Sequence, residues 1–212
     1  MNVSRFTVNP FGENTYVLWD ADSREAAVID PGMSNEAERE ALDKFIEREK
    51  LTPVHLVNTH QHIDHCLGNQ HIRTRYGLKL EANEGDDFLG QTLTEQSRRF
   101  GMRVTAENAA SEVHLADGDR LYVGKEPVEV IAVPGHSPGS IALYAPESGF
   151  VITGDALFPG SIGRTDLPGG SHSTLVNSIR TRLFTLPDDT VVLPGHGGET
   201  TIGIEKLSNP YL

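Results

Sequence analysis

The chain has 212 residues, which is long enough for one large α/β domain to bury a core without disulfide bonds. It is 37% hydrophobic and 23% charged, and its single cysteine excludes an internal disulfide and favours a reducing compartment. The formal net charge of −12 argues against a nucleic-acid partner, because phosphate backbones are bound by clustered Lys and Arg side chains.

The first half of the chain alternates between β-prone and helical segments. Short apolar runs bounded by turn residues predict strands over residues 6–8, 15–19, 26–29 and 53–58. Helices are predicted over residues 35–50, 66–75 and within 84–100. The first of these helices has a clear start, because Asn35 can cap it and Glu38 follows three residues later.

The second half returns to strands before a last helix. Strands are predicted over residues 112–115, 120–123, 128–133, 141–144, 150–153 and 190–193, and a helix over 173–183. We find no Pro/Gly/Ser linker, so we expect one α/β domain over residues 1–212, with two sheets back to back and helices outside. No segment is long and apolar enough for a membrane span or a signal peptide, so we expect a cytoplasmic protein without a membrane partner.

A cluster of histidines directly follows the strand predicted at 53–58. The run THQHIDH places three imidazoles and a carboxylate within six residues: His60, His62, Asp64 and His65. Imidazole suits Zn, Fe, Ni and Cu, and a carboxylate adds negative charge and can bridge two ions. Alternation along an extended turn would aim the first two histidines at one point and the last two ligands at a neighbouring point. The loop therefore predicts two metal ions, although a solvated His-rich loop is the alternative.

Three further candidate ligands each follow a glycine at the end of a predicted strand. They are His136 in Pro-Gly-His, Asp155 in Thr-Gly-Asp and His196 in Pro-Gly-His. Glycine lets the backbone turn sharply there and project the next side chain into a shared cleft. The other histidines and the cysteine are interpreted as core or surface residues: His55, His71, His114, His172 and Cys66. Four strand ends are thus expected to converge on one metal centre.

These motifs, taken in order, resemble the metallo-β-lactamase superfamily. The resemblance rests on the THxHxDH run, the PGHSPGS segment, the GDALF segment and the PGHG turn, and it spans nearly the whole chain. The GDALF segment together with SIGRTDLPGG resembles, more narrowly, short single-domain bacterial members of the glyoxalase II branch. The family implies a four-layer αβ/βα sandwich of two mixed sheets flanked by helices. We expect it here without the C-terminal helical substrate domain of longer glyoxalase II enzymes.

The resemblance also implies how the ligands divide between two divalent metals, zinc in the first instance and iron or manganese otherwise. Metal 1 would be held by His60, His62 and His136, and metal 2 by Asp64, His65 and His196, with Asp155 bridging them. Asp30 matches a family position near the site, where it would either position a ligand histidine or cap a turn.

The chemistry implied is hydrolysis by a metal-bridging hydroxide. Two close metals lower the pKa of a shared water toward about 7. Asp64 would orient the hydroxide, and metal 1 would take up charge on the oxyanion. A thiolate leaves without a strong general acid, and the sequence offers no obvious one. We therefore expect a small-molecule thioester substrate of the S-2-hydroxyacylglutathione type.

Substrate recognition is expected to involve Arg164. Glyoxalase II members carry a basic residue at the corresponding place, which holds the glycine carboxylate of glutathione, and a guanidinium can do so with two hydrogen bonds. A surface arginine that caps a loop is the alternative. The nearby tyrosine of the family is Asp166 here, which would repel a carboxylate unless Arg164 pairs with it.

Other reaction classes share parts of these motifs. Persulfide dioxygenases resemble this sequence and hold one iron, for which His60, His136 and Asp155 would supply the ligands. A nuclease of the RNase Z kind is disfavoured by the acidic balance and the lack of a basic segment, and a lactonase is a further alternative. A non-catalytic binding module would be expected to lose ligands, and none is missing here.

Overall fold

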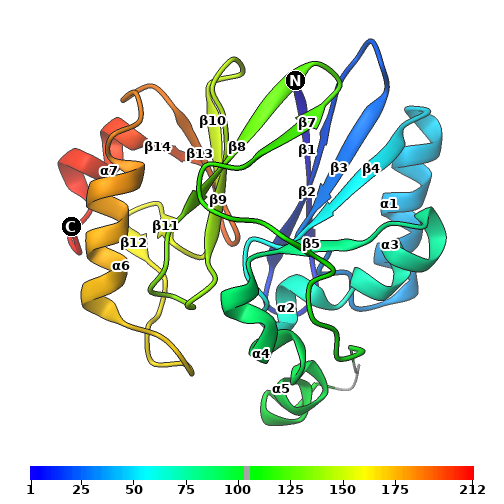
Figure 1. Cartoon of the computed structure of the whole chain (residues 1–212), viewed down its shortest axis with the longest axis horizontal. Coiled ribbons are helices and arrows are strands. Elements are labelled where there is room, and N and C mark those ends of the chain that lie inside the picture. The colour runs from blue at the N-terminus through cyan, green and yellow to red at the C-terminus, as the bar shows by residue number, and fades with distance from the viewer. Residues whose placement is uncertain (103–105) are drawn as a thin grey trace.

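Two six-stranded sheets face each other in the computed structural model, which describes residues 1–102 and 106–212 (Figure 1). The first sheet has the order β1 (Asn2–Val8), β2 (Glu13–Trp19), β3 (Glu25–Ile29), β4 (Thr52–Val57), β5 (Leu80–Ala82) and β6 (Val113–His114). The second has the order β14 (Thr200–Thr201), β13 (Val191–Pro194), β10 (Phe150–Gly154), β9 (Ile141–Ala145), β8 (Glu126–Ala132) and β7 (Arg120–Val123). Both sheets are mixed, because β3 to β6 pair in parallel in one and β10 pairs in parallel with β13 in the other.

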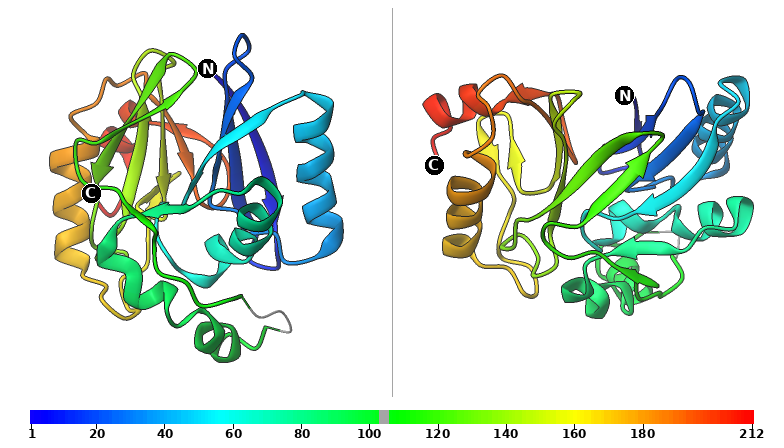
Figure 2. Two further views of the ribbon diagram at one scale, coloured as in Figure 1. Left: turned by 45° about the vertical axis from the view of Figure 1, so that its right-hand side comes forward. Right: turned by 45° about the horizontal axis from the view of Figure 1, so that its top comes forward.

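Helices cover the outer face of each sheet (Figures 1 and 2). The first sheet is covered by α1 (Glu36–Arg48) and α3 (Asn69–Tyr76). The second is covered by α6 (His172–Ser178), its π-helical continuation η2 (Ile179–Leu183) and α7 (Ile202–Ser208). The shorter helices α2 (Ile63–Cys66), η1 (Glu84–Asp86), α4 (Asp87–Gly90) and α5 (Leu93–Arg99) lie at one end of the sandwich. The order of layers is helix, sheet, sheet, helix, which confirms the expected fold class.

The core contains three main apolar layers, and a smaller apolar cluster joins α2 and α5. Between the sheets, Tyr16 and Leu18 of β2 pack with Ile141 and Leu143 of β9, all at most 1% exposed. A second cluster joins α1 and α3 to the first sheet, and a third joins α6 and α7 to the second sheet. Strand β2 is covered on both faces, which is why its apolar run is continuous rather than alternating. Each large apolar side chain buried in this way contributes about 1.5–3 kcal/mol.

Some expected boundaries were wrong. The helix predicted over 66–75 begins at Asn69, as α3, and a separate short helix that was not predicted, α2, ends at Cys66. Between them, the amide of Gly68 donates a 2.6 Å hydrogen bond to the carbonyl of Pro31, and a Cβ there would crowd Met33. The short strands β5, β11 (Leu157–Phe158), β12 (Ser161–Ile162) and β14, and helix α7, were not predicted. Across the described ranges, no helix is long and apolar enough to cross a membrane.

Candidate metal centre

The seven side chains expected to bind metal meet at the rim where strands of both sheets end. His60, His62, Asp64 and His65 follow β4, His136 follows β8, Asp155 follows β10 and His196 follows β13. Asp64 and His65 lie inside the short helix α2 rather than ahead of a helix. Glycines make the approach feasible: a Cβ at Gly195 would overlap the carboxylate of Asp155, and one at Gly135, whose φ is +136°, would overlap α6. The Gly-His pairs therefore serve close packing around the site.

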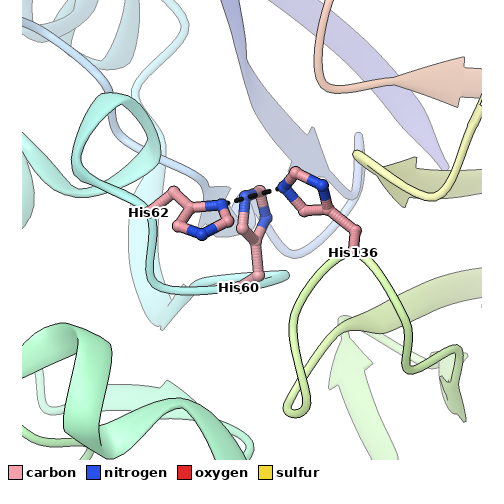
Figure 3. A group of neighbouring side chains, drawn as sticks. All are labelled: His60, His62 and His136. Atoms are coloured by element: carbon pink, nitrogen blue, oxygen red, sulfur yellow. Dashed lines mark hydrogen bonds between the residues drawn. The ribbon is translucent and has the colours of Figure 1, made fainter. Parts of the chain in front are cut away.

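The first group of ligands contains His60, His62 and His136, whose ring nitrogens lie within 4.8 Å of one another (Figure 3). Nδ1 of His62 lies 2.8 Å from Nε2 of His136. The loop after β4 carries two of these rings and the loop after β8 carries the third, and all three point toward a common centre. His62 thus faces the group with Nδ1, while Nε2 of His60 is buried and lacks a hydrogen-bond partner among the described residues. Buried nitrogens left in this state are suited to a metal ion.

The second group contains Asp64, His65 and His196. Nε2 of His196 lies 3.2 Å from Oδ2 of Asp64, and Nε2 of His65 lies 3.9 Å from the same oxygen. Asp155 lies between the two groups, because its Oδ2 is 3.6 Å from Nε2 of both His136 and His196. This is the position expected of a bridging carboxylate.

The carboxylate of Asp30 orients two of the candidate ligands through hydrogen bonds. Its carboxylate is 1% exposed and accepts hydrogen bonds from the amide (2.7 Å) and hydroxyl (2.6 Å) of Thr59 and from Nδ1 of His65 (3.1 Å). The hydroxyl oxygen of Thr59 in turn lies 3.2 Å from Nδ1 of His60, which can donate to it. One carboxylate thus orients a histidine of each group and leaves both Nε2 atoms directed inward. The backbone of Asp30 has φ +48°, which is energetically unfavourable for a residue other than glycine, and these hydrogen bonds offset that cost.

Main-chain carbonyls orient two more ligands. Nδ1 of His136 donates a 2.7 Å hydrogen bond to the carbonyl of Arg164, and Nδ1 of His196 donates a 3.2 Å bond to that of Phe11. The proton is thereby placed on Nδ1, and Nε2 is left free to bind a metal.

Electrostatics favour the ligand form at His60, His62 and Asp155, whereas at His65 and His196 burial is outweighed by nearby carboxylates, which raise the pKa of both imidazoles until a cation replaces the proton. Burial and the neighbouring His136 lower the pKa of His62 to about 3, and burial and His65 lower the pKa of His60 well below its usual value. Burial opposes ionisation of Asp155, yet His65 holds the pKa of that carboxyl well below its usual range. Neutral imidazoles and ionised carboxylates are the forms that bind metals. The residues present therefore fit a pair of divalent cations.

Asp86 is a site residue that sequence reasoning missed. It is fully buried and accepts hydrogen bonds from the amide of Gln61 (3.1 Å), the hydroxyl of Ser137 (2.6 Å) and the amide of Gly139 (2.6 Å). Gln61 lies between two ligand histidines, and Ser137 follows His136 directly. The carboxylate therefore joins the two loops that carry the first ligand group. Its only signal in the sequence was an acidic residue within a helical segment.

Glu13 is a second buried carboxyl that was missed. It is fully buried at the start of β2, with Oε1 3.8 Å from Nδ1 of His65 and Oε2 bonded to the hydroxyl of Thr15. Burial raises its pKa well above the usual value. A charged residue at the head of an otherwise apolar strand was the available signal.

The residues outside the centre are arranged largely as expected. Arg164 forms two 2.7 Å hydrogen bonds with Asp166, from Nε and from a terminal nitrogen, so the two charges are paired. The remaining histidines lie outside the cluster of ligands: His55 contacts Glu81, His71 contacts Asp43, His114 is exposed and His172 begins α6. Cys66 is buried at the end of α2, as a small apolar side chain.

Comparison with known proteins identifies the family. The model of the metallo-beta-lactamase superfamily matches residues 8–196. The hydroxyacylglutathione hydrolase GloC of Haemophilus influenzae is 40% identical over all of this chain and 98% of its own length. The human mitochondrial persulfide dioxygenase ETHE1 is 33% identical over 93% of this chain and 70% of its own.

Two solved structures superpose closely. The BLEG-1 B3 metallo-beta-lactamase has a TM-score of 0.90 at 35% identity, and covers 100% of this chain and 99% of its own. TTHA1623, solved in a di-iron-bound form, has a TM-score of 0.87 at 34% identity; the match covers 99% of this chain and 100% of TTHA1623. With its fold, its converging His and Asp side chains and a family match over most of its length, this chain belongs to the metallo-beta-lactamase superfamily.

Proposed function

We propose that this chain is a dinuclear metallohydrolase that cleaves a thioester of the S-2-hydroxyacylglutathione type. The observation that carries the proposal is the complete pair of ligand groups, with the carboxylate of Asp155 3.6 Å from Nε2 of a histidine in each. Two bound divalent cations, zinc in the first instance, would lower the pKa of a shared water and polarise the substrate carbonyl. The 40% identity to GloC supports a thioester as the substrate class.

Asp64 is suited to orient the attacking water. Its Oδ2 lies 3.2 Å from Nε2 of His196, and it lines the hollow above the ligands. Besides ligand side chains, this hollow is lined by Phe11, Ile63, Phe100, Arg164 and Leu167. Burial opposes the ionisation of Asp64, but His65 and His196 hold the pKa of the carboxyl below its usual value. An ionised Asp64 accepts a hydrogen bond and fixes the direction of the water.

The lining of this hollow also favours a leaving group that needs no proton. Among its described lining residues, Arg164 is the only one besides the ligands with a titratable side chain, and its guanidinium does not give up a proton. A thiolate can leave unprotonated because the pKa of a thiol is about 8.5, whereas an amide nitrogen must be protonated as it leaves. The site is therefore better suited to a thioester than to a lactam.

Arg164 is the residue proposed to bind the glycine carboxylate of the glutathione part of the substrate. Its side chain lines the hollow above the ligands and a second hollow bordered by Phe158 and His196. The pair it forms with Asp166 is 57% and 68% exposed, and such surface pairs contribute only about 0–1 kcal/mol. A substrate carboxylate can therefore replace Asp166 at little cost.

The decisive experiment combines metal analysis with two assays. We expect two metal ions per chain and hydrolysis of S-lactoylglutathione, both lost in Asp155→Ala and both retained in His114→Ala, whose exposed side chain lies outside the ligand cluster. The competing activity is that of the 33% identical persulfide dioxygenase, since His60, His136 and Asp155 also lie together here. One iron per chain with thiol-dependent oxygen uptake, and no hydrolysis, would contradict the proposal.

A further inference from the structure

An apolar pocket opens directly beside the metal centre. It has a volume of about 240 Å³, and its apolar lining residues are Phe88, Leu89, Phe100, Leu167 and Pro168; His62 of the first ligand group and four polar residues, Glu95 and Arg99 among them, complete the lining. None of the ligands except His62 lines it. Its walls are therefore not needed to hold metal.

The pocket is built from three separate segments of the chain. Phe88 and Leu89 belong to α4, Phe100 follows α5, and Leu167 lies in the loop after β12. Across the pocket, a Cβ on Gly169 would lie 3.4 Å from Cζ of Phe88, so helix α4 and the loop are in contact range. The rings of Phe88 and Phe100 are 44% and 38% exposed. Large apolar side chains that gather at the mouth of a cavity mark a binding surface.

The pocket is continuous with the reaction centre and lies away from Arg164. It shares His62, Phe100 and Leu167 with the hollow above the ligands. Arg164 lines that hollow and the one bordered by Phe158, but it does not line the apolar pocket. If the thiol carboxylate binds Arg164, the acyl side of the thioester extends toward His62 and into the pocket.

We propose that this pocket binds an apolar substituent on the acyl group of the thioester, with the size of an aromatic ring or a six-carbon chain. This assignment rests on the proposed thioesterase function. A cavity of about 150 Å³ lined by Leu, Ile and Phe is enough to hold benzene, so about 240 Å³ accommodates such a group. A lactoyl group offers one methyl to these walls and leaves most of the apolar surface uncovered.

The test is a series of glutathione thioesters in which only the acyl group changes. From acetyl to hexanoyl, we expect kcat/KM to rise about fourfold for each added methylene, mainly through a lower KM. A second series keeps a lactoyl group and lengthens an alkyl thiol, and here we expect no rise. A rise in the thiol series alone would place the thiol in the pocket and overturn the assignment.

Variants of the walls separate binding from folding. Phe88→Ala should lower the hexanoyl-to-acetyl ratio of kcat/KM about tenfold, and Pro168→Trp, which narrows the pocket from a position outside the hollow above the ligands, should lower it further. Both should leave acetyl hydrolysis within about twofold of wild type. Leu207→Ala, a 90% exposed position on α7, is the control and should leave the ratio unchanged.

The two levels of the proposal fail differently. If no thioester of either series is hydrolysed, the proposed function is wrong and the pocket assignment is wrong with it. If the whole acyl series is hydrolysed with one value of kcat/KM, and the wall variants do not alter the ratio, only the pocket assignment is wrong.

Discussion

We expect Asp86→Ala to reduce both stability and metal affinity, because this buried carboxylate joins two ligand-bearing loops. It accepts the amide of Gln61 at 3.1 Å, the hydroxyl of Ser137 at 2.6 Å and the amide of Gly139 at 2.6 Å. Alanine leaves all three donors without their acceptor in a fully buried place. The loops would then lose the connection that fixes the rings of the first ligand group.

The size of the effect follows from the three hydrogen bonds. Each is worth about 1 kcal/mol net, and more when a donor is left unpaired, so the free energy of unfolding should fall by about 3 kcal/mol. Removing a group that orients metal ligands typically weakens metal binding about 10–100-fold. Asp86→Asn keeps the volume and one carbonyl oxygen, and should lose about half as much stability.

Urea unfolding followed by circular dichroism measures the stability, and competition with a chromophoric chelator measures the metal affinity. Asp43→Ala is the matched control, because Asp43 is 9% exposed and accepts hydrogen bonds from Tyr76 (2.8 Å) and His71 (3.1 Å), none of them a ligand. The control should lose stability and keep its metal affinity. If Asp86→Ala binds both metals as tightly as wild type, the carboxylate does not position the ligands and the reasoning fails.

Three further predictions concern the bridge, the metals and a distant ion pair. Asp155→Ala should lower thioester hydrolysis by about 100-fold or more with reduced metal content; retained activity at low metal content would refute the mechanism. Chelation should lower the melting temperature and zinc should restore it, because ligands that bind only the folded state stabilise it. The hydrogen bond that Nδ1 of His55 donates to the carboxylate of Glu81 raises the pKa of His55, so the pair stabilises the fold below about pH 6.5 and its contribution is lost as the pH rises through the raised pKa. The stability deficit of Glu81→Gln should therefore be larger at pH 5.5 than at pH 8.5.

The parts of the site that the sequence predicted are those with local signals. His60 to His65 form one uninterrupted motif after an apolar strand, so neither register nor distant pairing had to be known. His136, Asp155 and His196 each follow a glycine at a strand end, and that pattern can also be read within a few residues. The two-sheet layering followed from the alternation of strands and helices and from the family resemblance.

The parts that were missed depend on contacts between distant segments. Asp86 acts on Gln61 and Ser137, which lie 25 and 51 residues away, and nothing in its own neighbourhood marks this role. Strands β11, β12 and β14 have two residues each, too few for a periodic pattern. The start of α3 was predicted too early, and α2 was missed, because the break between them lies at Gly68. The amide of Gly68 bonds the carbonyl of Pro31, which is distant in the sequence.

Arg164 shows why a residue's role in this site cannot be read from its type alone. Its backbone carbonyl accepts the hydrogen bond that orients His136, whereas its side chain pairs with Asp166 at the surface. Every residue type has a backbone carbonyl that can accept the hydrogen bond from His136, although proline would restrict the backbone here. Only a cationic side chain can form the ion pair with Asp166. The loop after β12 therefore orients a candidate metal ligand through its main chain, and its side chains are free to contact the proposed substrate. Leu167 and Pro168 of the same loop line the apolar pocket, so we expect changes in this one segment to alter substrate specificity and preserve metal binding.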